Sequence, residues 1–449
     1  MTLLVRDRPA PATASAAAGA WRGRSVAVVV CDALHAAHLS CYGADQPTSP
    51  EIDALAQAGV RFATFRSQTA WTVPSIATLF TGATQEAHGV RDVGLVLAAT
   101  WPTLAEAFRA AGYATAAFVQ NKLVTRETGL DRGFDEWREY PGESRDALQP
   151  ELEAFLARPR ERPLFLYVHL LPPHAPYQPP AGFAGRFGQP KGVIDGSVRS
   201  LGELAQRQPK ANDPHVVTLR GLYRNHVAYG DTLAGAVARA FFGDRPQQAA
   251  LLLLSDHGEA FGQHEAVGHN VQVFDEMVHV PLVAVAPGSA TPAGRVIAAP
   301  CFMPDLAPTL RELCALPADD AAEQDPAATS GRSLATAFAP TPDEFTPRVQ
   351  ALSARFLEGD ARQRALVFGR FKLVSPAGRR ATALFDLAAD PAESIDVSPN
   401  HPVLAAALRQ ELAQFAAAAQ FGAASDTFTP DAQLRAELEA LGYGAAGGR

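Results

Sequence analysis

The stretch SVAVVVCD, residues 25–32, is an unbroken run of small and β-branched residues that ends in an acidic residue. Such a run is typical of a central parallel strand that is buried on both faces. Two similar runs follow, LFLYVHL at residues 164–170 and ALLLLSD at residues 250–256. Together they predict a mostly parallel sheet that is sandwiched by helices.

Segments with helical periodicity separate these strands. SPEIDALAQAGVRF, residues 49–62, begins with a Ser that can cap a helix and a Pro in the first turn, and a Gly precedes the next short strand. TLAEAFRAAGYATAAFV, residues 103–119, repeats the order of helix, turn and strand. Residues 219–241 and 304–316 predict two further helices. This alternation predicts an α/β fold with helices on both faces of the sheet.

The remaining segments predict the domain organisation. Residues 1–24 are rich in Ala and Pro and carry charges where a secretory signal needs an unbroken apolar segment, so we expect a flexible leader. A large α/β domain is expected over residues 25–330. After a stretch rich in Ala, Asp, Pro and Thr, strand-like pieces and then a helix predict a small antiparallel α+β subdomain within residues 345–449.

Composition and charge exclude some partners. The chain has 449 residues and a net charge of −8 at pH 7, from 39 Lys and Arg against 47 Asp and Glu. A nucleic-acid surface needs a basic face, so we expect no nucleic-acid partner. No run approaches the ~20 apolar residues of a membrane span, so we expect a cytoplasmic protein with no membrane partner. The sequence leaves homo-oligomerisation open.

Acidic residues at two strand ends predict a metal site. Asp32 and Asp256 each end a buried run, and His257 follows directly. Ligands of open α/β sheets bind at the carboxyl ends of the strands, so these side chains are expected to converge. Two carboxylates and an imidazole suit one divalent metal ion, either Mn, Zn, Ca or Mg. Taken singly, Asp32 is equally compatible with a turn residue and His257 with a structural histidine.

A hydroxyl at a helix start is the candidate nucleophile. TVPSIATLFTG, residues 72–82, predicts a helix with Thr72 as its N-cap and Pro74 in the first turn. Metal coordination and the positive helix end can lower the pKa of an alcohol enough for attack, so Thr72 is also expected at the metal. The local sequence alone is equally explained if Thr72 is only an N-cap and has no catalytic role. Ser75 is the rival hydroxyl, but within a helix it is expected to bond to backbone.

Four histidines are candidates for contact with substrate. His169 and His174 lie in HLLPPHAPY, and His264 and His269 lie in the loop after Asp256. A histidine there can donate to a substrate oxygen or protonate a leaving group. We expect His174 and His269 to act in catalysis, and His169 and His264 to bind substrate. For His169, a structural histidine at a strand end is equally compatible.

Together these motifs resemble those of the sulfatases within the alkaline phosphatase superfamily. The likeness extends over about residues 25–402. It rests on the motifs CDALHAAHLSCYG, TSPEIDALAQAGVRF, TVPSIATLFTG, GLDRGFDEW, HLLPPHAPY, SDHGEAFGQHEAVGH, VPLVAVAPG and LFDLAADPAES. The resemblance implies a large α/β domain with a smaller four-stranded C-terminal subdomain. By position in the motifs it also implies metal ligands at Asp32, Asp256 and His257, a nucleophile at Thr72, and substrate contacts from His174 and His269.

Several positions depart from the sulfatase pattern. Sulfatases carry a Cys or Ser at the nucleophile position and convert it to formylglycine, whereas oxidation of Thr72 would give a ketone. The Arg that supports the nucleophile is replaced by Ile76, and the second acidic residue after the first metal Asp is Ala33. Sulfatases carry a Lys and a His after the next strand, where this chain has VQNKLV. Asn121 and Lys122 are the candidate substrate-binding residues in that segment.

By resemblance, Thr at this position is typical of the phosphodiesterases and phosphotransferases of the superfamily. We therefore expect a metal-dependent hydrolase of phosphodiester or phosphonate-type esters, with a small anionic ester as its substrate. One alternative is a sulfuric ester hydrolase that works without formylglycine. The other is a degenerate member that binds an anion or a metal without turnover.

Overall fold

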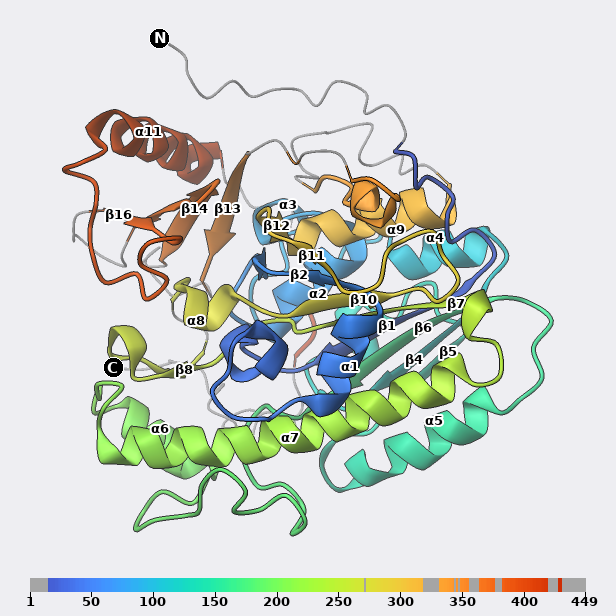
Figure 1. Ribbon diagram of the computed structural model, residues 1–449, viewed down its shortest axis with the longest axis horizontal. Coiled ribbons are helices and arrows are strands. Elements are labelled where there is room, and N and C mark those ends of the chain that lie inside the picture. Colours follow the sequence, from blue (N-terminus) through green and yellow to red (C-terminus); the bar gives the residue numbers. More distant parts are fainter. Residues whose placement is uncertain are drawn as a thin grey trace.

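The computed structural model describes residues 15–269, 272–317, 331–342, 345, 348–354, 363–375, 382–418 and 427–429. Its centre is an eight-stranded sheet in the order β11-β2-β10-β7-β1-β6-β4-β5 (Figure 1). These strands are β1 (Ser25–Cys31), β2 (Val60–Phe62), β4 (Ala114–Val119), β5 (Glu136–Glu139), β6 (Leu164–Leu170), β7 (Ala249–Leu254), β10 (Leu282–Val285) and β11 (Arg295–Ile297). Only β10 runs antiparallel to its neighbours, so the sheet is mostly parallel, as the sequence predicts.

Strand β1 explains why its sequence shows no alternation. Val26, Val28 and Val30 belong to one hydrophobic core, and Ala27 and Val29 belong to a second core. Successive side chains of a strand point to opposite faces, so both faces of the sheet must be covered. The first core contains helices α2 (Thr72–Thr81), α4 (Leu104–Ala110) and α9 (Leu306–Cys314). The second contains α1 (Pro50–Ala58), α5 (Leu148–Leu156) and α7 (Pro214–Phe242), and Figure 1 shows α7 as the long helix below the sheet.

Helix α7 begins earlier than the predicted range of residues 219–241. Asp213 caps it by accepting from the backbone N–H of His215 at 2.8 Å, and Pro214 occupies the first turn. At α1 the predicted N-cap is Ser49, but its hydroxyl bonds to Asp53 instead of the helix backbone. The first backbone N–H groups of α1 are instead bound by Asp231 of α7.

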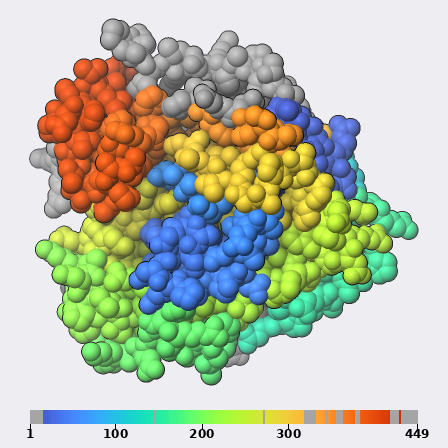
Figure 2. All heavy atoms as spheres, viewed as in Figure 1, coloured from blue at the N-terminus to red at the C-terminus, as the bar shows by residue number. Residues whose placement is uncertain are grey.

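A small antiparallel subdomain follows, as predicted. Its sheet is formed by β13 (Val349–Ser353), β14 (Arg364–Phe368), β15 (Phe371–Ser375) and β16 (Ala383–Asp386). Helix α11 (Pro402–Ala418) packs on one face of this sheet, and the other face packs on the large domain near α8 (Asp275–Val278). In Figure 2 these C-terminal residues, in orange and red, form one lobe beside the large domain.

Part of the predicted flexible leader is packed. Trp21 is fully buried, and its ring meets that of Phe338 edge-on at 4.9 Å. The backbone N–H groups of Gly19 and Trp21 bind the carbonyl groups of Glu312 and Leu313 in α9. The leader prediction is therefore wrong for residues 15–24, because it gave no weight to a Trp that can fill a core. Residues 1–14 lie outside the described part of the chain.

Short elements complete the large domain. They are β3 (Phe65–Arg66), β8 (Ala260–Phe261), β9 (Val267–Gly268), β12 (Cys301–Phe302), α3 (Gln85–His88) and α6 (Val198–Ala205). Strands β8 and β9 form a hairpin after β7, and β3 pairs with β12. Among the described residues, no helix has both the length and the apolar character needed to cross a bilayer.

Candidate metal and active site

Four polar side chains meet at the carboxyl edge of the central sheet. Asp32 directly follows β1, and Asp256 comes two residues after β7. His169 is the penultimate residue of β6, and Asn121 comes two residues after β4. The four strands are parallel neighbours in the order β4-β6-β1-β7, so their carboxyl ends lie side by side.

Helix α2 brings the Thr72 hydroxyl to this edge. The N-cap is Trp71, so Thr72 is the first helical residue and not the predicted N-cap. Its Oγ1 lies 3.3 Å from His257 Nε2, and both residues are fully buried. The rival hydroxyl is engaged elsewhere, because Ser75 Oγ donates to the backbone carbonyl of Asp256 at 2.6 Å. That bond ties the first turn of α2 to the segment that carries the candidate ligands.

The ε nitrogen of His257 is a point of convergence. It lies 3.5 Å from Asp32 Oδ1 and 3.5 Å from Asp256 Oδ2. The Nδ1 atom is 2.9 Å from the carbonyl oxygen of Gly258, which only accepts, so Nδ1 carries a proton and Nε2 is the nitrogen that can offer a lone pair to a cation. Neither carboxylate oxygen has a hydrogen-bond partner among the described residues. Without a cation, a lone pair and two buried anionic oxygens would repel one another.

These donor atoms fit a divalent cation. Oxygen and nitrogen ligands bind such ions at roughly 2.0–2.5 Å, which places neighbouring ligand atoms roughly 3–3.5 Å apart. A second set, Asp32, His169 and Asp256, also offers one ligand atom each within 4.8 Å of one another. However, both nitrogens of His169 are engaged, since Nε2 is 3.2 Å from Asp32 Oδ2 and Nδ1 is 2.8 Å from the Tyr167 hydroxyl. We therefore place His257, and not His169, in the candidate ligand set.

Asp32 is held by neighbours that the sequence assigned to substrate. Asn121 Nδ2 donates to Asp32 Oδ2 at 2.5 Å, and Asn121 Oδ1 accepts from the N–H of Leu123 at 2.7 Å. His169 contacts the same Oδ2 atom. Asn121 and His169 thus support Asp32 through its Oδ2 atom, and their contact with substrate stays a prediction. Burial opposes ionisation of Asp32, but His174, His169 and His257 lower the pKa of its carboxyl below the usual range, as a metal ligand requires.

Asp256 is oriented by backbone. Its Oδ1 accepts from the N–H groups of Ala33 and His257 at 3.2 and 3.0 Å, which leaves Oδ2 directed toward the centre. Residue 258, two positions after Asp256, must be glycine, because a Cβ on Gly258 would lie 2.3 Å from the carbonyl oxygen of Glu276 in α8. The motif after β7 therefore serves both to aim a ligand and to pack tightly against α8.

His174 and His269 lie together beside the candidate ligands. The His269 ring centroid is 4.3 Å from that of His257 and 5.1 Å from that of His174. His269 Nδ1 lies 3.0 Å from Glu259 Oε1. Sequence reasoning did not single out Glu259, because its contact with His269 depends on the register of β8 with β9.

His264 lies away from the site, contrary to the prediction. Its Nδ1 is 2.8 Å from Glu276 Oε1, and its Nε2 is 3.1 Å from the carbonyl oxygen of Glu393 in the C-terminal subdomain. Its ring stacks on Phe274 at 3.5 Å. The cause is local, because His264 sits in a left-handed turn conformation, with φ 48°, that sends its side chain to the interface.

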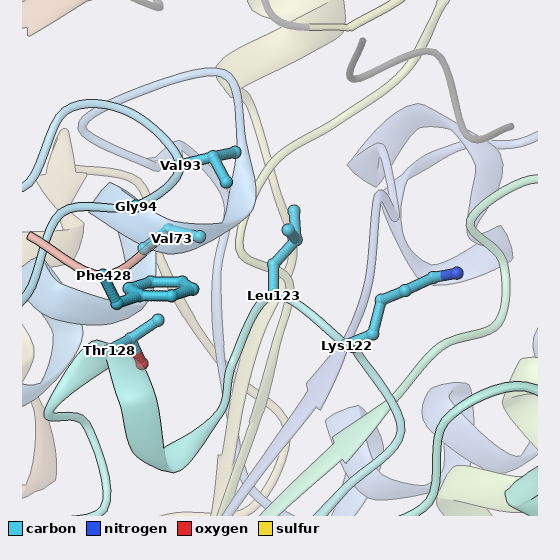
Figure 3. Close-up of a pocket in the computed structure, with 7 residues that line it drawn as sticks. All are labelled: Val73, Val93, Gly94, Lys122, Leu123, Thr128 and Phe428. Carbon is cyan, nitrogen blue, oxygen red and sulfur yellow. The ribbon is translucent and has the colours of Figure 1, made fainter. Parts of the chain in front are cut away.

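Lys122 is half-buried beside a small pocket at the start of α2. The residues that line this pocket are Val73, Val93, Gly94, Lys122, Leu123, Thr128 and Phe428. Figure 3 shows the Lys122 amino group pointing away from the Phe428 ring. None of the candidate metal ligands lines this pocket, so it is separate from the metal centre.

Comparison with known proteins now identifies the family. Residues 24–315 match the family Sulfatase. The chain belongs to the sulfatase family. Among curated relatives, it is 24% identical to a Δ4,5-hexuronate-2-O-sulfatase of Bacteroides thetaiotaomicron, over 66% of this chain and 69% of that protein. It is 23% identical to an ulvan-active sulfatase of Formosa agariphila, over 67% of this chain and 63% of that protein. The chain thus spans about two thirds of the length of these sulfatases.

Solved structures agree on the fold. A 2-O GAG sulfatase superposes with a TM-score of 0.72 at 19% identity, over 89% of this chain and 93% of that one. The phosphonate monoester hydrolase of Agrobacterium radiobacter superposes with a TM-score of 0.70 at 21% identity, over 91% of this chain and 100% of that one. Members of this sulfatase family are hydrolases of sulfuric or phosphoric esters and generally bind a divalent metal. The predictions of fold and family are confirmed.

Proposed function

We propose that this protein is a single-metal hydrolase of phosphodiester or phosphonate-type esters, with Thr72 as the nucleophile. One observation carries the proposal. The Thr72 hydroxyl, the His257 lone pair and two carboxylate oxygens without hydrogen-bond partners converge at one buried point. A divalent cation held there by Asp32, Asp256 and His257 would lower the pKa of the neighbouring hydroxyl and offset charge on the phosphoryl oxygens.

The proposed reaction uses covalent catalysis by Thr72. Its Oγ forms a bond to phosphorus while the bond from phosphorus to the alcohol oxygen breaks, and the Thr72 proton leaves to solvent. The alcohol oxygen takes a proton from His269 or His174. Water then attacks the phospho-threonine and regenerates the free hydroxyl. The N-terminus of α2 adds its positive end to the field at this oxygen.

The residues around Thr72 favour phosphorus over sulfur. A sulfo-threonine lacks the elimination route that the hydrate of formylglycine provides, whereas a phospho-threonine can be cleaved by water. Ile76, at the position of the sulfatase Arg, is fully buried in the apolar core, so no cation supports the nucleophile from there. A site with one cation and few basic groups suits a singly charged diester or phosphonate ester better than a dianion. One structural neighbour is itself a phosphonate monoester hydrolase.

A matched set of aryl esters tests the proposal. Protein loaded with Mn²⁺ would be offered a phosphodiester, a phosphonate monoester, a phosphate monoester and a sulfate with the same aryl group, each also with Thr72→Ala. We expect the diester or the phosphonate to be cleaved fastest. If sulfate cleavage dominates, the alternative of a sulfatase without formylglycine replaces this proposal. If no ester is turned over with Mn²⁺, Zn²⁺, Mg²⁺ or Ca²⁺, the degenerate binding member replaces it.

A further inference from the structure

The hairpin after the metal-ligand segment sets Glu259 opposite His269. Strands β8 and β9 are antiparallel, with Ala260 opposite Gly268 and Phe261 opposite Val267. The same register places Glu259 opposite His269, where Oε1 and Nδ1 are 3.0 Å apart. The turn of the hairpin packs closely on the backbone around residue 211, since a Cβ on Gly262 would lie 2.5 Å from it.

Both carboxylate oxygens of Glu259 have a side-chain partner. It is fully buried, and its Oε2 accepts from the Tyr177 hydroxyl at 2.8 Å while Oε1 faces His269. Tyr177 is itself buried against Tyr223 and Phe261. A carboxylate with both oxygens fixed can hold a histidine ring in one orientation.

The geometry distinguishes His269 from His174. Because a carboxylate only accepts, His269 Nδ1 carries a proton, and Nε2 is the ring atom that can serve the substrate. The Nδ1 of His174 instead lies 2.7 Å from the backbone carbonyl of Ala175, which is the very next residue. The Nδ1 contact of His269 is thus made with a separate, buried side chain, whereas that of His174 is made with adjacent backbone.

We infer that Glu259 is a positioning residue that fixes the orientation of His269 by accepting its Nδ1–H, so that the Nε2–H of the protonated ring faces the leaving alcohol and is given to it, and that Tyr177 fixes Glu259 in turn. This role rests on the ester hydrolysis proposed above. His269 is the group that contacts substrate, and Glu259 acts through it. The consequence is chemical: loss of Glu259 should matter most for alcohols that leave poorly and need a proton.

Kinetics on two phosphonate esters test this role. For Glu259→Ala we expect kcat to fall about 100-fold on a phenyl ester and less than about 5-fold on a dinitrophenyl ester, which leaves without help. Glu259→Gln keeps an acceptor oxygen and should recover part of the loss, and Tyr177→Phe should shift the ratio in the same direction by less. Equal losses on both esters would overturn the inference.

Two controls distinguish an effect of Glu259 through His269 from a general loss of structure. Glu276→Gln alters another Glu–His pair, that of Glu276 in α8 with His264, and should leave the ratio of the two esters unchanged. In a His269→Ala background, Glu259→Ala should add almost nothing, whereas additive losses would contradict the inference. Metal content is measured for each variant, since Glu259 is close to His257.

A readout without turnover keeps the two proposals distinguishable. Nitrogen-15 NMR of protein loaded with Mg²⁺ should show His269 with its proton on Nδ1, and a mixture of tautomers in Glu259→Ala. If this holds but no ester is cleaved, the proposed function fails and the positioning role stands. If the wild-type ring carries no proton on Nδ1, the positioning role fails whatever the activity.

Discussion

Thr72 Oγ1 lies 3.3 Å from His257 Nε2, although the two residues are 185 positions apart in the chain. One comes from the start of α2 and the other from the segment that follows β7. Neither side chain reaches solvent, and the same nitrogen faces two carboxylate oxygens without hydrogen-bond partners. This relationship links the candidate nucleophile to the candidate metal ligands.

Supports of Asp32 should control metal affinity. Asn121→Ala removes a 2.5 Å hydrogen bond to Asp32 Oδ2. Loss of a group that orients a metal ligand typically weakens binding by about 10- to 100-fold, and we expect that range for Mn²⁺ measured by calorimetry. Asn225→Ala is the matched control, because Asn225 is equally buried but bonds to backbone at residues 187 and 188. Equal effects of the two variants would contradict the assignment.

Metal should stabilise the fold through Asp256. A ligand at about 100 times its Kd adds about 2.7 kcal/mol to the free energy of unfolding, so Mn²⁺ should raise Tm and a chelator should lower it. In Asp256→Asn this rise should disappear. The metal-free variant should be at least as stable as the metal-free wild type, because one of two facing buried carboxylates has been neutralised. A metal-dependent rise that survives in Asp256→Asn would place the ion elsewhere.

A buried ion network should anchor the C-terminal subdomain. Lys372 is fully buried, with Nζ 2.8 Å from Asp275 Oδ1 and 2.9 Å from Glu393 Oε1. Lys372→Met leaves both carboxyl groups without this partner and should cost about 3–5 kcal/mol in urea unfolding. Arg370→Met is the control, since Arg370 is 59% exposed and its pair with Asp386 should contribute less than about 1 kcal/mol. Similar losses in both variants would refute the difference.

Asp231 should make stability depend on pH. Burial is the main cause that raises the pKa of Asp231 from 3.8 to about 7, against hydrogen bonds from the N–H groups of Ile52 and Glu51. The folded state then binds more protons than the unfolded state between pH 4 and about 7. This group therefore lowers the free energy of unfolding as pH rises through that window, by up to about 1.4 kcal/mol per pH unit. Asp231→Asn should flatten the slope, and exposed Asp244→Asn should not.

The sequence predicted what depends on local pattern. Unalternating strands that end in Asp32 and Asp256 follow directly from burial on two faces, and the helix that begins at Thr72 was misplaced by only one position. The contact of Asn121 with Asp32 was not predicted, because it depends on the lateral order of β4, β6 and β1. That order is set by tertiary packing.

Loop residues were harder to predict for a related reason. Glu259 meets His269 only through the register of the hairpin, and His264 turns away because of a left-handed backbone conformation. Neither feature has a strong signal in the local sequence. Trp21 shows the opposite error, since a single large apolar side chain within an Ala-rich segment was enough to anchor it in the core.

The most direct test of the central claim compares Thr72→Ala and Thr72→Ser, both loaded with Mn²⁺, on the ester that the wild type cleaves fastest. Measured metal content must match the wild type. We predict that Thr72→Ala loses at least about 1000-fold in kcat, because the attacking oxygen is gone, and that Thr72→Ser retains measurable turnover through its own hydroxyl. Turnover by Thr72→Ala at a rate close to that of the wild type would show that water attacks directly and would contradict the account.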